Sequence, residues 1–249
     1  MKSLLDLPRG GEQSLGVYIS DLGVVATEIA GICGFDYMRV DYEHVMLNPQ
    51  DLASIIRAAS AADVPTLVRV SGFDEITKIL DIGASGILMP GISSVEQARA
   101  AANACKYAPV GERGMAGASR AIGYGLGDMG EYFATANDRV AFCAQIESRE
   151  GVENAEAIAN LEGVDIVTTG PWDLAQDMGH IGNPGHPEVI EATEHVIKKT
   201  LDAGKIMLMS AATPEDATKL KSKGVLMATV CFDVIFFARA MRAHIEKFR

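Results

Sequence analysis

Residues 65–90 read PTLVRVSGFDEITKILDIGASGILMP and contain a strand, a helix and a second strand in direct succession. The first run, residues 65–70, is short and apolar apart from Thr66 and Arg69, and the last, residues 86–90, is short and continuously apolar. Between them apolar residues recur at helical spacing up to Gly83, which ends the helix. Two short buried strands joined by one helix are typical of a parallel sheet that helices cover.

The same unit repeats along the rest of the chain. We expect strands, each followed by a helix, at residues 16–20, 35–41, 65–70, 86–90, 139–147, 164–169, 206–209 and 225–230. Eight repeats favour a closed (β/α)8 TIM barrel over an open doubly wound sheet. An open sheet would place a Gly-x-Gly-x-x-Gly turn after the first strand, where the chain instead reads SDLG at residues 20–23. We therefore predict an α/β protein, a single (β/α)8 domain over residues 1–249.

Composition excludes several classes of function. The 249 residues carry a formal net charge of −11, which argues against nucleic acid or an anionic membrane as a partner. No apolar run approaches the ~20 residues that a membrane-spanning helix needs. The start, MKSLLDLPRGGE, meets a charge and a proline too early for a signal peptide, and the four cysteines form no Cys-x-x-Cys pair. We expect a cytoplasmic protein with free thiols.

Polar residues gather where the predicted strands end, and barrel enzymes work at that rim. These residues are Asp41, His44, Arg69, Gln145, Glu147 and Asp173. Each has an ordinary structural explanation when taken alone, such as a helix cap for Asp173 or a solvated loop position for His44. Six of them on one rim favour a functional site.

The residue types on this rim suggest a chemistry. Glu147 and Asp173 are carboxylates from neighbouring strands, and we expect them to share one divalent cation such as Mg²⁺ or Mn²⁺. A 2-oxo acid would chelate that cation through its carboxylate and keto oxygens, which makes its α-proton removable. Arg69 would stabilise the enolate oxygen, and His44, oriented by Asp41, would act as general base.

Lysine placement separates two aldolase chemistries. An imine-forming enzyme needs a lysine that projects into the barrel near the strand ends. The lysines here fall on predicted helices or their ends, and Lys205 enters the seventh strand at the opposite end. The Gly-rich stretch at residues 108–127 leaves two roles open for Arg113 and Arg120: binding a carboxylate or forming a lid, or holding subunits together from a surface excursion.

Several motifs, in this order, resemble the HpcH/HpaI aldolase family over about residues 16–233. They are DYEH at 41–44, LVRV at 67–70, GERG at 111–114, QIE at 145–147, GPWDL at 170–174, MG at 178–179 and HP at 186–187. The resemblance implies a class II pyruvate aldolase on a (β/α)8 barrel. Such an enzyme cleaves 4-hydroxy-2-oxo acids to pyruvate and an aldehyde through a metal-bound pyruvate enolate.

The resemblance also implies roles and partners. It assigns Glu147 and Asp173 to a divalent metal (Mg²⁺, Mn²⁺ or Co²⁺), without an organic cofactor. It assigns proton transfer and enolate binding to His44, Asp41 and Arg69, and substrate binding to Gln145, Gly170, Pro171 and Trp172. The expected partners are a small 2-oxo acid, an aldehyde and further copies of the chain. Those copies would form a homohexamer, a trimer of dimers, with the last helix at about residues 233–248 exchanged between neighbours.

Two alternatives remain beside the aldolase. Another metal-enolate enzyme on this scaffold, an acyl-CoA lyase or an oxaloacetate decarboxylase, would use the same residues. A catalytically silent barrel that binds a metabolite would not need them. Three departures from the family pattern bear on aldehyde specificity: Tyr18, where tryptophan is common; Arg39, within a strand that is usually apolar at that position; and the run MLM at residues 207–209.

Overall fold

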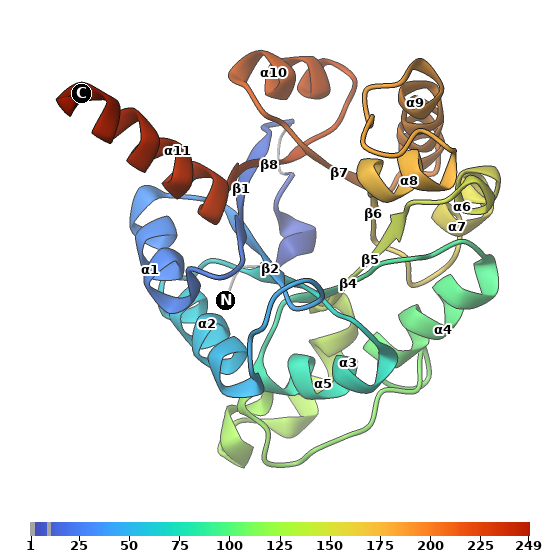
Figure 1. The fold of residues 1–249 in the computed structure, drawn as a ribbon. Coiled ribbons are helices and arrows are strands. Elements are labelled where there is room, and N and C mark those ends of the chain that lie inside the picture. Colours follow the sequence, from blue (N-terminus) through green and yellow to red (C-terminus); the bar gives the residue numbers. More distant parts are fainter. Residues whose placement is uncertain (1–2, 9–10) are drawn as a thin grey trace.

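The computed structural model describes residues 3–8 and 11–249, and its centre is a closed barrel of parallel strands (Figure 1). The strands are β1 (Ser14–Ile19), β2 (Tyr37–Asp41), β3 (Thr66–Arg69), β4 (Gly86–Met89), β5 (Ala141–Ile146), β6 (Ile166–Thr169), β7 (Ile206–Ser210) and β8 (Met227–Phe232). Each strand pairs with the next in sequence, and β8 pairs back onto β1 with Leu15 opposite Ala228. The predicted TIM barrel is confirmed.

Helices surround the barrel and connect successive strands (Figure 1). They are α1 (Gly23–Cys33), α2 (Pro49–Ala61), α3 (Phe73–Ile82), α4 (Val95–Cys105), α5 (Met129–Arg139), α6 (Arg149–Glu153), α7 (Ala155–Ala159), α8 (Pro171–Asp177), α9 (Pro187–Asp202), α10 (Pro214–Ser222) and α11 (Asp233–Ile245), with 3-10 turns η1 (Leu4–Asp6), η2 (Arg120–Gly125) and η3 (Glu246–Phe248). Side chains at the helix starts secure several of them; for example, Asn48 and Asp51 form a reciprocal cap on α2. Within the described residues no helix is long and apolar enough to cross a bilayer.

Apolar side chains fill the barrel interior toward the N-terminal ends of the strands. This cluster comprises Leu4, Tyr37, Leu67, Leu88, Ala141, Cys143, Ile166, Leu208 and Met227. Because alternate residues of a strand face the same side, the inward positions of β2 after Tyr37 are Arg39 and Asp41. The interior therefore changes from apolar to polar toward the C-terminal ends of the strands, where the predicted site lies.

The last helix departs from the ring. Figure 1 shows α11 extending outward from the end of β8. Large apolar side chains on it are exposed, among them Phe236, Phe237 and Met241, and α1 likewise exposes Ile29 and Ile32. Both helices thus leave large apolar side chains uncovered in the single chain.

Candidate active site

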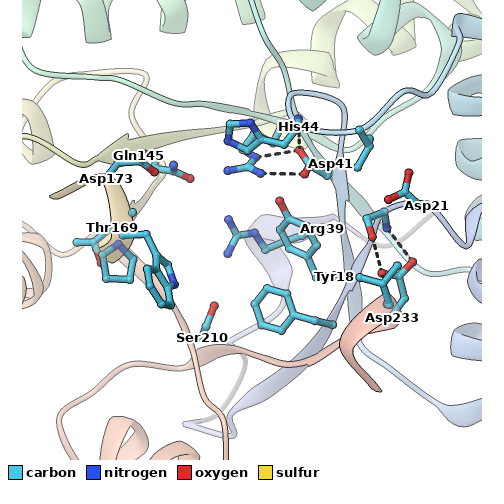
Figure 2. A pocket seen from close by; sticks show the side chains of 18 residues that line it. Tyr18, Asp21, Arg39, Asp41, His44, Gln145, Thr169, Asp173, Ser210 and Asp233 are labelled. Atoms are coloured by element: carbon cyan, nitrogen blue, oxygen red, sulfur yellow. Dashed lines mark hydrogen bonds and ion pairs between the residues drawn. The ribbon is translucent and has the colours of Figure 1, made fainter. Parts of the chain in front are cut away.

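A pocket of about 600 Å³ opens at the C-terminal ends of the strands (Figure 2). Eight of the nine predicted site residues line it, namely Asp41, His44, Arg69, Gln145, Gly170, Pro171, Trp172 and Asp173. They come from the ends of β2, β3, β5 and β6 or from the segments that follow those strands. The rim position expected from the sequence thus brings these residues together around one cavity.

The ninth residue, Glu147, lies beside the pocket. Its Oε1 accepts a hydrogen bond of 2.7 Å from the backbone N–H of Gly91, and its Oε2 accepts one from the side-chain amide of Gln145. A Cβ on Gly170 would lie 2.3 Å from Oε2, so any side chain at this position would displace the Glu147 carboxylate. Burial raises the pKa of the Glu147 carboxyl, and the nearby charge of Asp173 raises it further.

Helix α8 begins directly at the pocket. Gly170 precedes it, and Pro171 occupies its first turn, a position where the missing N–H costs nothing. The N–H groups of Trp172 and Asp173 open the helix and therefore have no intrahelical acceptor. Trp172 lines the pocket, and its side chain is exposed.

Arg69 and Asp41 form a bidentate ion pair in the pocket. Nε and Nη2 of Arg69 donate to the two carboxylate oxygens of Asp41 at 3.0 and 2.9 Å, and Nε also lies 3.2 Å from the Glu43 carboxylate. Although burial alone would raise the pKa of Asp41, the hydrogen bonds from Arg69 hold it below its ordinary value. Asp41 is therefore a carboxylate that fixes the guanidinium.

His44 has a different partner from the expected one. The sequence suggested that Asp41 orients its imidazole, but Arg69 binds the Asp41 carboxylate. The contact of His44 with that carboxylate is through its backbone N–H, at 3.4 Å, and not through its imidazole. Nε2 of His44 lies 3.4 Å from Glu43 instead. The reason is the strand register. Asp41 and Arg69 are paired residues of β2 and β3, so the guanidinium lies directly beside the carboxylate.

Several residues in or beside the pocket were not expected from the sequence. Glu43 lies beside the pocket, 3.2 Å from Nε of Arg69, and its position between Asp41 and His44 in the sequence was a usable signal. Asp233 accepts hydrogen bonds from the N–H of Ser20 at 2.9 Å and from its hydroxyl at 2.6 Å, which ties β1 to the start of α11. None of the described residues that line this pocket is a lysine, in agreement with the lysine placement expected from the sequence.

The Gly-rich stretch does not bring its arginines to this pocket. Nη2 of Arg113 lies 2.7 Å from the Asp81 carboxylate of α3. Arg120 donates to the carbonyl of Ile82 and to the hydroxyl of Ser60, both at 2.9 Å. Both guanidinium groups thus fasten the stretch to the outside of the barrel.

Known proteins resemble the chain over nearly its full length. The profile of the HpcH/HpaI aldolase/citrate lyase family matches residues 15–240. A 2-keto-3-deoxy-L-rhamnonate aldolase from Klebsiella pneumoniae is 35% identical over 257 residues, covering 100% of this chain and 96% of the relative. Among solved structures, an HpcH/HpaI family protein from Burkholderia cenocepacia has 33% identity and a TM-score of 0.90, covering 98% of this chain and 97% of that one. The citrate synthase SbnG has 28% identity and the same TM-score, covering 98% and 96%.

The family match covers far more than half of the chain, and the aldolase relative exceeds 30% identity over the whole of it. The protein is accordingly an enzyme of the class II aldolase type. Because aldolases of this class depend on a divalent metal, membership supports a metal cofactor for this chain, without identifying the ion. The chain belongs to the HpcH/HpaI aldolase/citrate lyase family.

Proposed function

We propose that this aldolase reversibly cleaves 4-hydroxy-2-oxo acids to pyruvate and an aldehyde. The proposal is supported by one pocket of the barrel rim that Asp173 and the Arg69–Asp41 pair line, with Glu147 directly beside it, against Gly170. The aldolase relative supports the substrate class, because a 2-keto-3-deoxy sugar acid has the 2-oxo group and the 4-hydroxyl that retro-aldol cleavage requires.

The donor set at this pocket fits a hard divalent cation. Oxygen ligands suit Mg²⁺, Mn²⁺ or Co²⁺, and the Glu147 carboxylate lies against Gly170, where a side chain would displace it. Burial raises the pKa of Glu147, and the charges of Asp173 and Glu43 raise it further, so a divalent cation between these carboxylates would offset their repulsion. We propose Glu147 and Asp173 as its ligands. Such a cation polarises the keto group of a bound 2-oxo acid and so acidifies its α-protons.

The protein's own groups would do the rest. Arg69 uses Nε and Nη2 for Asp41, which leaves Nη1 to face the negative charge that develops on the keto oxygen. The backbone at Gly170, Pro171 and Trp172 would receive the substrate carboxylate.

Proton transfer would fall to His44. This residue lines the pocket, and imidazole is the side chain that most often transfers protons in enzymes. Glu43 lies beside the ring, and Asp41 holds the backbone N–H of the same residue. Gln145 lines the pocket and donates to Glu147, so it would both touch substrate and fix the carboxylate.

We also propose that the chain, a single domain over residues 1–249, assembles as a homohexamer built from three dimers. The support is the outward path of α11 and the apolar side chains that it and α1 expose (Figure 1). A neighbour's α11 would cover Ile29 and Ile32 of α1 while its own Phe237 is buried. The free thiols Cys33, Cys105, Cys143 and Cys231 support a reducing, cytoplasmic location.

The proposal is tested by stripping metal with a chelator, restoring Mg²⁺, Mn²⁺ or Co²⁺, and measuring pyruvate release from a panel of 4-hydroxy-2-oxo acids. Glu147→Gln should abolish metal-dependent release, because the neutral amide is a poor ligand for a hard cation. Glu150→Gln, an exposed change in the first turn of α6, is the matched control and should leave release unaltered. Unchanged activity in Glu147→Gln, or after chelation, would remove the metal assignment.

A further inference from the structure

Arg39 lies in the middle of β2 with its side chain inside the barrel. It is 7% exposed and lines the pocket, one inward position below Asp41 and one above Tyr37. Figure 2 shows its guanidinium pointing away from β2 into the space between Tyr18 and Thr169. The charge thus lies at the floor of the pocket, beneath the Arg69–Asp41 pair.

Within the described residues, this buried cation has no acidic partner. Its Nε is buried without a hydrogen-bond acceptor. The guanidinium forms a cation–π contact with the Tyr18 ring, whose centroid lies 5.2 Å from the guanidinium carbon. Of the carboxylates that line the pocket, Asp41 is bound by Arg69 and Asp233 by Ser20, and among the described residues neither Asp21 nor Asp173 forms an ion pair with Arg39. Arginine is almost never this buried without pairing, because losing water is costly for an uncompensated charge.

The position of Arg39 determines which part of a ligand it can reach. In the closed eight-stranded barrel, β2 is four strands from β6 in either direction, so the two strands face each other across the interior. Of the groups proposed for the 2-oxo acid end, Glu147, Asp173 and the start of α8 follow β5 and β6, and Arg69 ends β3, two residues beyond the level of Arg39. A ligand held there by its oxo-acid end would direct its other end toward Arg39.

We propose that Arg39 is a specificity-determining residue that binds a second carboxylate of the substrate. The inference rests on the proposed function and deepens it: the preferred substrate carries two acid groups. A guanidinium offers two parallel N–H donors, which match a carboxylate. The second carboxylate belongs either to the 2-oxo acid that donates carbon or to the aldehyde that accepts it, and these two sources are separable by experiment.

The first arm of the test measures binding without turnover. Calorimetry on the Mg²⁺-loaded protein compares 2-oxoglutarate with 2-oxopentanoate, which has the same length and a methyl in place of the distal carboxylate. The second arm measures turnover, comparing 4-oxobutanoate with butanal as acceptors for pyruvate. Wild-type protein should favour the charged member of at least one pair by roughly tenfold to hundredfold, the factor expected for a charge-assisted hydrogen-bonded contact.

The variants assign that preference to Arg39. Arg39→Leu should abolish it while changing the neutral member by less than about twofold, and Arg39→Lys should retain part of it. Arg57→Leu, an exposed change on α2, is the control and should keep the full preference. Because Arg39→Leu removes an unpaired buried charge, its Tm should be unchanged or higher.

The outcomes are distinguishable. Equal binding of both members of each pair by wild-type protein, or a preference that survives in Arg39→Leu, would overturn the role of Arg39. A lower Tm with equal losses on charged and neutral ligands would also overturn it, since that pattern indicates a structural arginine. Failure of pyruvate to react with either 4-oxobutanoate or butanal would instead count against the proposed aldolase function, while the calorimetric arm still decides on Arg39.

Discussion

Replacing Gly170 with alanine should disable the metal site through one methyl group. The new Cβ would lie 2.3 Å from Oε2 of Glu147, 3.0 Å from its Cβ and 3.1 Å from Nε2 of Gln145. Ordinary contact begins at 3.4 Å, so the carboxylate must retreat by about 1 Å. That retreat is resisted by the 2.7 Å hydrogen bond from Gly91 to the other carboxylate oxygen.

The size of the effect follows from this displacement. A 1 Å misplacement of a catalytic group costs about 100-fold in rate, and disturbing the surroundings of a metal ligand costs about 10- to 100-fold in metal affinity. We expect kcat/KM of Gly170→Ala to fall by about 100-fold and Mg²⁺ affinity by at least about tenfold. Overpacking by one methyl costs about 1–3 kcal/mol, which lowers Tm by roughly 2–10 °C and leaves the protein folded.

The assay pairs isothermal calorimetry of Mg²⁺ binding with steady-state pyruvate release. Gly114→Ala is the control, because no atom lies within 4 Å of a Cβ at that position and its backbone is not left-handed. It should bind Mg²⁺ and turn over like wild-type protein. Wild-type metal affinity and rate in Gly170→Ala would refute the reasoning that this glycine makes room for a metal-binding Glu147.

Three further predictions concern proton transfer, pH and assembly. His44→Ala should slow the α-proton exchange of pyruvate while Mg²⁺ affinity, measured by calorimetry, stays nearly intact; equal loss of both would make His44 a ligand. Because burial raises the pKa of Glu147, protons compete with metal above the ordinary value of 4.5, so Mg²⁺ affinity in a pH titration should fall as the pH drops toward that raised pKa. The pH dependence of thermal stability has the opposite sign in the metal-free protein. The contribution of Glu147 to stability is present at low pH and is lost as the pH rises through the same raised pKa. A Glu147→Gln variant whose Mg²⁺ affinity and Tm change with pH as in wild-type protein would contradict both statements. Phe237→Asp on α11 should reduce the mass seen in sedimentation velocity, whereas an unchanged mass would place the subunit contact elsewhere.

The barrel was predictable because its information is local. Each strand is a short apolar run and each helix carries its own periodicity, so eight repeats fix the architecture without knowledge of any contact. The rim was predictable for the same reason, since parallel strands place all their carboxyl ends on one side. This is why Asp41, Arg69, Gln145 and Asp173 were expected around one cavity, and the structure gathers them there.

The partners of these side chains were not predictable, because they depend on register between strands. Pairing of Asp41 with Arg69 follows from their alignment on β2 and β3, which sequence spacing does not reveal. Glu147 falls one residue beyond the end of β5, so its carboxylate turns toward Gly91 and Gly170 and lies beside the pocket. Likewise, the lack of an acidic partner for Arg39 emerges only when the whole interior is assembled.

The central claim is that an acidic pair at the barrel rim holds a divalent cation that activates pyruvate for carbon–carbon bond chemistry. The most direct measurement is proton NMR of pyruvate in D₂O with the protein, before chelation, after chelation and after Mg²⁺ is restored. Methyl-proton exchange should stop with the chelator, return with Mg²⁺ and be absent in Glu147→Gln. Exchange that continues without metal, accompanied by a lysine adduct trapped with borohydride, would contradict it.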